Sequence, residues 1–412
     1  MALRRVIENC EVYQDQSAVI AFIDFKKAFD SVHRHYLVDT LVDYGISRYL
    51  IRAIMSLYWT STVQVVTTHG LTDRIPVRRG VLQGDTLAPY LFVLVLDRVL
   101  RKALDGGSWG YCVRQRSGSR SPSEYVTDLS YADDIALFST SFELADSMLT
   151  SVSAAAREAG LGINFAKTEV LVVGDLARAE PTRTLSLDGV QLNRVDSFVY
   201  LGSKVPSSKD EISRRIQQAT FNSGKLRNVW AAPLTRALKV RIFRALVDPI
   251  LFYACETWTT TKVDLLRLRG VRNRLLRRAL EIRWYERVPN SELYKLNTSV
   301  APKIVEERRL RFVGHVTRFV HNPTSLQPIN QLLWFLPQGA TRRTTHRRTN
   351  TFHDSLTGLL GHEFTTWYTA RCANRWAEWT TPPPRFQPTL ANLWGSVSPS
   401  ASSLIDTLDS TT

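Results

Sequence analysis

The sequence is poor in cysteine and short of acidic residues, and it contains no long uninterrupted apolar run. Its four cysteines are widely separated and show no CxxC pair or Cys/His ligand spacing, which argues against a zinc site and a disulfide framework. We therefore expect an intracellular protein with reduced cysteines. The longest apolar stretch, residues 90–96, is far shorter than the ~20 residues that cross a bilayer, so no membrane partner is expected.

Positive charge is in clear excess. The 412 residues include 53 Lys+Arg and 38 Asp+Glu, which gives a formal net charge of +15. Such an excess favours an anionic partner, most commonly nucleic acid, although a merely basic globular protein is the plainer alternative. The hydrophobic content of 44% is enough for a sizeable core, and the length allows two or three domains.

Apolar periodicity predicts an antiparallel sheet backed by helices in the first half of the chain. The expected order is strand 18–25, helices 37–45 and 51–58, strand 63–65, helix 87–95, loop 106–122, two strands meeting at 133–134, helix 144–160 and strand 167–173. Thr140 and Glu143 predict a capping box before the helix 144–160. Residues 212–319 are typical of basic helices, with arginines on one face and apolar residues on another: Arg267, Arg274 and Arg278 against Leu268, Leu275 and Ala279.

Two acidic motifs lie beside apolar strands. Asp24 lies at the end of the run 18–25, where a carboxylate is costly to bury unless a cation compensates its charge. Asp133 and Asp134 are adjacent, and like charges raise each other's pKa. Taken alone, Asp24 also fits a helix N-cap or an ion pair, and the Asp pair also fits a turn. Together the three carboxylates can converge on one point of a sheet. There they would hold two divalent cations ~3.5–4 Å apart, the arrangement that polymerases use for in-line displacement. Mg²⁺ suits such oxygen ligands.

A third motif, residues 79–89, contains Gln83 and Gly84 at the entrance of an expected helix. A glycine there lets another backbone or a base approach closely, and Gln83 beside it could contact a base or a sugar. By itself the motif also fits a plain turn with an aspartate cap.

In combination these motifs resemble those of the reverse transcriptases of non-LTR, LINE-type retrotransposons. The resemblance is carried, in the family's order, by the segments 22–32, 80–89, 131–134 and 160–169. Residues 198–202 resemble the segment that grips the primer end, and 253–259 and 309–315 resemble the C-terminal part of such elements. The resemblance implies an α+β fold: a right-hand polymerase palm with residual fingers at 1–203, a basic helical thumb or connection at 204–320 and a C-terminal helical region at 321–397. The Ser/Thr-rich composition of residues 398–412 predicts a disordered tail.

The resemblance also implies a role for each matched residue. Asp24, Asp133 and Asp134 become the catalytic carboxylates that bind two Mg²⁺ ions, with Mn²⁺ as an alternative. The Phe25 carbonyl becomes an extra ligand, and Lys167 becomes a proton donor to the leaving pyrophosphate, although a plain surface lysine is the alternative. The remaining roles are a gate against ribose at Phe29, nascent base-pair and template contacts at Gln83 and Gly84, a primer grip at Tyr200, Leu201 and Gly202, and phosphate contacts at Arg274, Arg277 and Arg278.

The function that the resemblance implies is RNA-directed DNA polymerase, acting in the nucleus on an RNA template, a DNA primer and deoxynucleoside triphosphates. Oligomeric state is not indicated. Thr86 stands where the family has proline, and only about two dozen residues precede Asp24, where fingers and an endonuclease are expected. A truncated, inactive remnant that retains only nucleic-acid binding is therefore the alternative. A metal-dependent nuclease is a third hypothesis, disfavoured because hydrolysis needs neither Gln83-Gly84 nor a sugar gate at Phe29.

Overall fold

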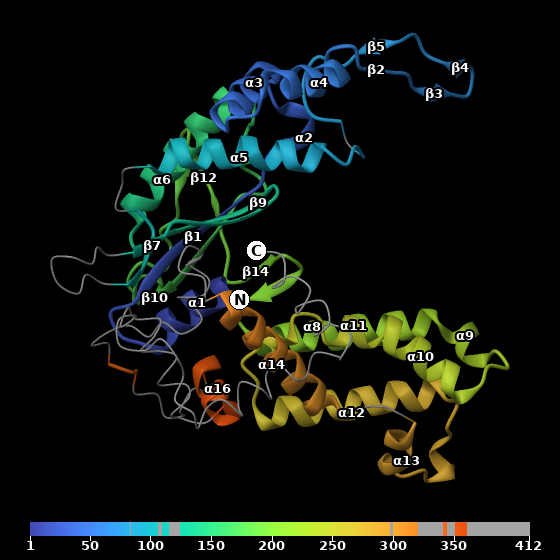
Figure 1. Ribbon diagram of the computed structural model, residues 1–412. Coiled ribbons are helices and arrows are strands. Elements are labelled where there is room, and N and C mark those ends of the chain that lie inside the picture. The colour runs from blue at the N-terminus through green and yellow to red at the C-terminus, as the bar shows by residue number, and fades with distance from the viewer. Residues whose placement is uncertain are drawn as a thin grey trace, which may run out of the picture. The chain divides into compact units, whose positions relative to one another are not determined.

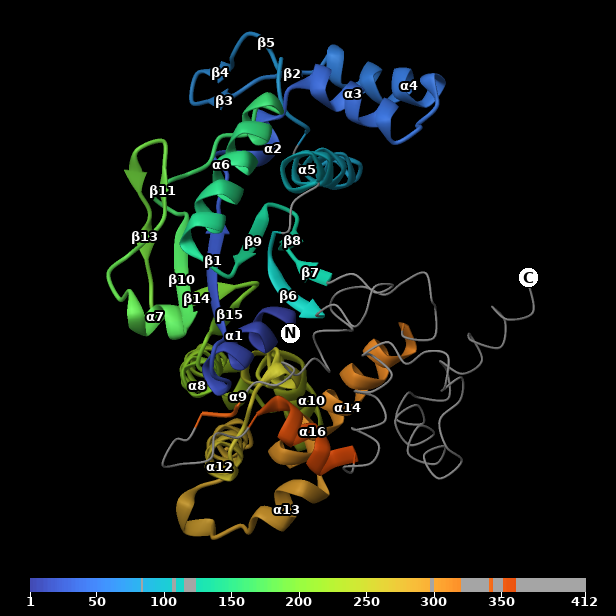
Figure 2. The same cartoon turned by 90° about the vertical axis from the view of Figure 1, so that its left-hand side faces the viewer.

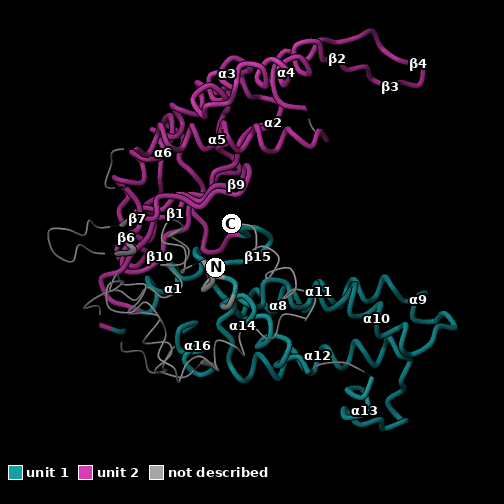
Figure 3. Tube along the Cα trace, viewed as in Figure 1, with its two compact units in different colours: residues 1–12, 199–338, 342–412 teal, residues 13–198, 339–341 magenta. Residues whose placement is uncertain are grey.

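The computed structural model describes residues 1–82, 84–105, 109–114, 124–296, 300–319, 341–343 and 351–360. The chain divides into two compact units, shown in Figure 3. The unit that we call the sheet unit comprises residues 13–198 and 339–341, and the helical unit comprises 1–12, 199–338 and 342–412. The boundary after residue 198 lies close to the expected one at 203, but the first twelve residues group with the helical unit.

A five-stranded sheet, in the order β13-β10-β1-β9-β8, organises the sheet unit (Figure 1). β1 is central and runs antiparallel to both of its neighbours, whereas β13 adds a short parallel edge to β10. The central position of β1 agrees with its almost continuous apolar sequence, because such a strand has no face that needs water. The bounds are β1 Ser17–Ile23, β8 Asp128–Tyr131, β9 Asp134–Ser139, β10 Glu169–Gly174 and β13 Asn193–Arg194.

Helices cover one face of this sheet and close the main hydrophobic core. Alternate residues of β1, namely Val19, Ala21 and Ile23, pack with apolar residues of the helices in a single buried cluster. α5 and α6 lie over this face in Figures 1 and 2. The helices are α2 Ala28–Ser31, α3 Arg34–Asp43, α4 Arg48–Trp59, α5 Ala88–Leu104, α6 Phe142–Glu158 and α7 Asp175–Ala179.

Two local predictions in this unit are wrong. Ser141, not Thr140, caps α6, because the Ser141 hydroxyl accepts the Leu144 amide hydrogen at 3.3 Å. Part of the predicted loop 106–122 is a strand, since buried Tyr111 pairs with Val126 across a hairpin. The short strands are β2 Thr62–Val63, β3 Val66–Thr67, β4 Gly70–Leu71, β5 Ile75–Pro76, β6 Tyr111–Arg114, β7 Glu124–Val126, β11 Ser186–Leu187 and β12 Val190–Gln191.

The helical unit confirms the prediction of basic helices after residue 212. Its core is a second apolar cluster, and Leu268, Leu275 and Ala279 are buried in it on one face of α12. Within the described ranges no helix is both long enough and apolar enough to span a bilayer. The elements are α1 Ala2–Val12, β14 Phe198–Tyr200 at the unit boundary, β15 Ser203–Val205, α8 Ser208–Lys225, α9 Arg227–Ala231, α10 Arg236–Leu246, α11 Asp248–Leu251, η1 Cys255–Thr257, α12 Lys262–Ala279, η2 Trp284–Glu286, α13 Asn290–Lys295, α14 Ala301–Phe319 and α16 Phe352–Leu360.

Candidate active site

The register of the central strands brings together carboxylates that are more than a hundred positions apart in the sequence. The last pair of the β1–β9 ladder is Ile23 with Ile135, so Asp24 and Asp134 come next at the same strand ends. Directly opposed side chains in antiparallel sheets have Cβ atoms about 4.5–5.5 Å apart. Asp133 lies in the two-residue connection between β8 and β9, whose pairing closes at Asp134. All three acids therefore lie at one end of the sheet.

Asp24 is fixed by a loop that precedes β10. Its Oδ2 accepts a hydrogen bond from the Asn164 side chain at 3.0 Å, and its backbone carbonyl accepts one from the Asn164 amide at 2.8 Å. Lys167 Nζ lies 3.9 Å from the same Oδ2, and the buried Thr168 hydroxyl accepts the Asp24 amide hydrogen. The sequence predicts a role for Lys167 but not for Asn164, which lies in the segment 160–169 and contacts both the carboxylate and the backbone carbonyl of Asp24.

The negative charges at this end of the sheet affect the pKa of Asp134. Partial loss of water, followed by the charges of Asp133 and Asp24, raises the pKa of the Asp134 carboxyl. Among the described residues no three His, Cys, Asp or Glu side chains converge closely enough to form a metal cluster. The three carboxylates therefore share one end of the sheet and repel one another, but their side chains as placed do not form a closed metal-binding cluster.

The raised pKa of Asp134 predicts a pH-dependent effect on stability. A carboxylate with a raised folded-state pKa favours folding while it is protonated, and this contribution is lost as the pH rises through that pKa. In metal-free buffer at pH 7, Asp134→Asn should therefore raise the free energy of unfolding, by less than about 1 kcal/mol at this exposed position. The gain should vanish below pH ~3.9, where the unfolded-state carboxyl is also protonated. Urea titrations at several pH values would measure this change in the free energy of unfolding. Asp39→Asn, at an exposed position of α3, is the control.

The turn after β1 and the segment that begins at Gly80 are bonded to each other. The Gly80 amide donates to the Val32 carbonyl, and the Val81 amide donates to the Phe29 carbonyl, both at 2.8 Å. Gly80 has φ +78°, and a Cβ atom there would lie 2.6 Å from the Asp30 Cα. Only glycine fits this approach, which the sequence reasoning had assigned to Gly84 instead.

Substitutions at the two glycines should therefore have unequal effects. Gly80→Ala combines left-handed strain with a backbone overlap, and we expect it to lower the free energy of unfolding by more than about 2 kcal/mol. Gly84→Ala has the φ penalty alone, about 1–2 kcal/mol, because nothing lies within 4 Å of a Cβ at this position. Chemical denaturation of both variants would test the difference, and equal losses would contradict the backbone contact.

The structure places the other predicted substrate contacts as follows. Phe29 is half-buried and stacks on Phe92 of α5, with ring centroids 4.6 Å apart. Phe25 is buried and pairs with Ile163 in the loop that holds Asp24. Gly84 is exposed with φ +88°, and Gln83 lies outside the described residues.

Asp85 organises the entrance of α5, a role that the sequence reasoning limited to a cap. Its carboxylate accepts the Leu87 amide hydrogen at 3.2 Å and the hydroxyl hydrogen of buried Tyr58 at 3.1 Å. Burial, followed by this hydrogen bond, raises the pKa of Tyr58 to about 12. The Arg34 guanidinium donates to the Tyr58 carbonyl, which connects α3 and α4 to the same turn. Thr86 is exposed and precedes α5 by two residues.

The expected primer grip lies in the helical unit. Leu201 and Gly202 form the turn between β14 and β15, both with positive φ, as two-residue hairpins favour. The Leu201 carbonyl accepts the Tyr253 hydroxyl hydrogen at 3.0 Å, and the Gly202 carbonyl accepts from Arg215. Tyr200 ends β14 just before this turn. These contacts hold the turn rigidly within its own unit.

The three arginines expected to bind phosphate lie on α12. Arg274 and Arg278 are exposed, whereas Arg277 is half-buried and donates to the Val288 carbonyl and the Asn290 side chain. Arg277 therefore holds the segment after α12.

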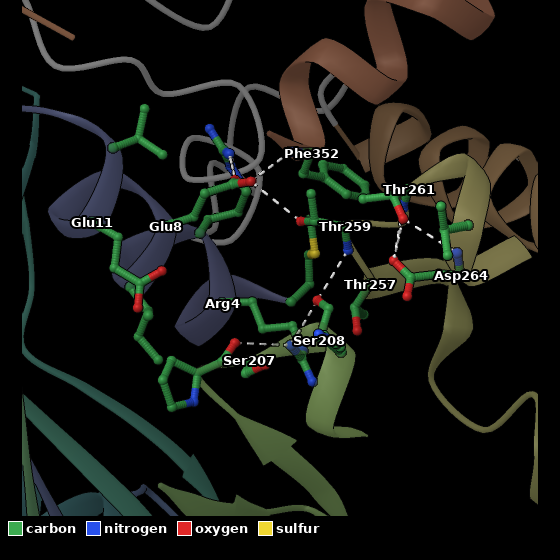
Figure 4. A pocket seen from close by; sticks show the side chains of 17 residues that line it. Arg4, Glu8, Glu11, Ser207, Ser208, Thr257, Thr259, Thr261, Asp264 and Phe352 are labelled. Atoms are coloured by element: carbon green, nitrogen blue, oxygen red, sulfur yellow. Dashed lines mark hydrogen bonds and ion pairs between the residues drawn. The ribbon is translucent and has the colours of Figure 1, made fainter. Parts of the chain in front are cut away.

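The helical unit also contains a cavity of about 680 Å³, shown in Figure 4. Its charged lining is internally bonded: Arg4 donates to the Lys204 carbonyl at 2.6 Å, and Glu8 accepts the Phe352 amide hydrogen at 2.6 Å. Burial lowers the pKa of Arg4 to about 10. These contacts attach α1 to the rest of the unit, and we assign the cavity no ligand.

Comparison with known proteins identifies the family of this chain. Residues 3–205 match the family described as reverse transcriptase (RNA-dependent DNA polymerase). A transposon-derived protein of Caenorhabditis elegans is 31% identical over 206 residues, which are 47% of this chain and 72% of that protein. The chain belongs to the reverse transcriptase family of non-LTR retrotransposons, and the predicted α+β palm fold is confirmed.

Two further relatives are Pol polyproteins of retrotransposable element R2. The one from Popillia japonica is 26% identical over 245 residues, and the one from Nasonia vitripennis is 29% identical over 256 residues. These matches cover 58% and 60% of this chain. The chain spans only 38% and 23% of the length of those two relatives.

Proposed function

We propose that the sheet unit catalyses RNA-templated DNA synthesis, adding deoxynucleotides to a primer 3′-hydroxyl. The observation that carries the proposal is the register that sets Asp24 beside Asp134, with Asp133 in the adjoining turn. Within a family of RNA-dependent DNA polymerases, such a trio at the end of a central strand is suited to metal-assisted phosphoryl transfer. The substrates under this proposal are an RNA template, a DNA primer and deoxynucleoside triphosphates, in the nucleus.

The donor chemistry of the trio fits a divalent cation. Asp24, Asp133 and Asp134 would hold Mg²⁺ or Mn²⁺, because hard cations prefer carboxylate oxygens. When bound, two such ions lower the pKa of the primer hydroxyl and neutralise charge on the leaving pyrophosphate. Asn164 would keep the Asp24 carboxylate oriented, and the exposed ammonium of Lys167, 3.9 Å from the same carboxylate, would give a proton to the pyrophosphate.

The helical unit would serve as the thumb under the same proposal. Its hairpin turn at 200–202 would hold the primer end, and exposed Arg274 and Arg278 on α12 would contact phosphates. The rigid attachment of that turn to Tyr253 and Arg215 supports a positioning role, because a primer terminus must be held to within a fraction of an ångström.

A primer-extension assay beside a binding titration tests the proposal. The chain should bind an RNA–DNA hybrid with strong salt dependence and extend the primer only when Mg²⁺ or Mn²⁺ is present. Binding without extension would favour the remnant that only binds nucleic acid. Cleavage of the strands without extension would favour a nuclease.

The position of Phe29 predicts a sugar-selectivity phenotype. If its half-buried ring lies under the incoming sugar, Phe29→Val should admit ribonucleotides while deoxynucleotide use persists. The ratio of kcat/KM for deoxynucleotides over ribonucleotides should fall at least about tenfold, since removing a steric contact of this size is worth about 1–3 kcal/mol. Phe92→Leu, which changes the stacked partner inside the main core and leaves Phe29 in place, is the control. An unchanged ratio in Phe29→Val would show that Phe29 serves only in packing.

A further inference from the structure

The segment that follows α12 exposes two aromatic side chains side by side. Trp284 is 89% exposed and Tyr285 is 65% exposed in the short helix η2, between α12 and α13 (Figure 1). Their rings lie 6.0 Å apart at 78° to each other. Exposing an indole to this degree forgoes about 1.5–3 kcal/mol of burial, so a surface tryptophan of this kind is typical of a binding site.

The backbone under the two rings is rigid. The Arg283 amide donates to the Glu286 carboxylate at 2.6 Å, and the Ile282 amide donates to the Arg277 carbonyl at 3.0 Å. Arg277 also donates to the Val288 carbonyl at 3.0 Å, which fixes the far side of the turn to α12. The rings are therefore presented on a fixed base, and little conformational entropy is lost when a ligand binds them.

The surroundings of the rings are positively charged. Arg283 and Arg287 flank them directly, and Arg278 lies at the end of α12, all exposed. Two acids lie nearby in the sequence: Glu281 pairs with Lys239 at 2.7 Å, and Glu286 of η2 accepts the Arg283 amide hydrogen. Open aromatic faces beside exposed arginines suit a ligand that has both flat rings and negative charge.

We propose that Trp284 and Tyr285 form a stacking site for unpaired bases of single-stranded nucleic acid, with phosphates contacted by Arg283 and Arg287. Stacking on an exposed ring requires a base that is free of its partner, because a paired base within a duplex already has neighbours on both faces. Protein interfaces are also rich in Trp, Tyr and Arg, so the choice of nucleic acid depends on the exposed arginines around η2, which suit a polyanion. The site goes beyond the polymerase function, since it uses none of the palm carboxylates.

Binding of a 15-nucleotide oligouridylate, measured by fluorescence anisotropy on the full chain, tests the site. Trp284→Leu should weaken binding roughly 5- to 150-fold, whereas Trp284→Phe should keep most of the affinity because it retains a stacking face. Affinity for a blunt RNA–DNA hybrid should change less than about twofold in Trp284→Leu. Arg283→Gln combined with Arg287→Gln should reduce the magnitude of the slope of log K against log salt by about 1.4, because two phosphate contacts to a single strand are lost.

The matched control is Phe221→Ala in α8 of the same unit. Phe221 is 64% exposed, and Lys225 Nζ lies 4.6 Å from the centroid of its ring, so one face of that ring is already occupied. Equal losses for Trp284→Leu and Phe221→Ala, or unchanged oligouridylate affinity in Trp284→Leu, would overturn the proposal. It would also be overturned if Trp284→Leu abolished self-association in sedimentation while leaving oligouridylate binding intact. Primer extension plays no part in these readouts, so failure here is separate from failure of the polymerase proposal.

Discussion

Asp24→Asn and Asp134→Asn should each reduce RNA-templated primer extension by about 10³-fold or more. Each carboxylate is a direct oxygen ligand in the proposed metal site, and metal stabilisation of the transition state amounts to several kcal/mol. Hybrid affinity should change less than about threefold, because phosphate contacts come mainly from basic residues. Single-turnover extension rates and equilibrium titrations on the same preparations would separate the two effects.

The control for charge removal is Asp39→Asn, an exposed acid of α3. It should leave extension within about twofold, because general field effects of one exposed charge are screened at physiological salt. Asn164→Ala provides an intermediate test. This substitution removes the hydrogen bond from Asn164 to the Asp24 carboxylate but keeps the carboxylate itself. The rate of primer extension should therefore fall less than in Asp24→Asn. Full primer-extension activity in Asp134→Asn would contradict the proposal that the carboxylates at the ends of the central strands take part in catalysis.

The second large effect concerns stability of the helical unit. Arg272 and Asp248 form a buried bidentate ion pair, with two N–O distances of 2.8 Å and side chains that are 1% and 9% exposed. Arg272→Leu should lower the free energy of unfolding by about 3–5 kcal/mol, because it leaves the Asp248 carboxylate buried without its partner. Thermal and urea unfolding, followed by circular dichroism, would measure the loss.

A double variant distinguishes the pair from the packing around it. Arg272→Leu combined with Asp248→Leu should recover much of the stability, since an apolar pair of similar volume avoids the uncompensated charge. The exposed pair of Lys295 and Glu292 in α13 is the control, and Glu292→Gln should cost less than about 1 kcal/mol. A loss in the double variant as large as the sum of the single losses would show that the two charges act independently.

The fold was predictable where one pattern is strong over many residues. The apolar run before Asp24 predicted the central strand, and adjacent Asp133 and Asp134 between two strands predicted the hairpin. The proximity of the three acids required more than periodicity. Strand order depends on tertiary pairing, which no local pattern encodes, and here the resemblance to a known family supplied it.

Other features could not be predicted because they depend on contacts between distant segments. The requirement for glycine at position 80 arises from the backbone of Asp30, fifty positions earlier. It can be recognised only once the turn after β1 is known to pack against Gly80. Asn164 became significant only once its loop was seen against Asp24. Whether Thr140 or Ser141 caps α6 depends on a difference of one residue in where the helix begins, and sequence patterns define helix ends poorly.

The discontinuous helical unit has a consequence for synthesis on the ribosome. Arg4 of α1 donates to the carbonyl of Lys204, so α1 lacks this partner until about two hundred more residues have been translated. Residues 13–198 can meanwhile collapse as an insertion inside an unfinished domain, because their own core is complete without α1. During that interval the apolar face of α1 is open to chaperones and to other nascent chains, which exposes this helix to misassembly.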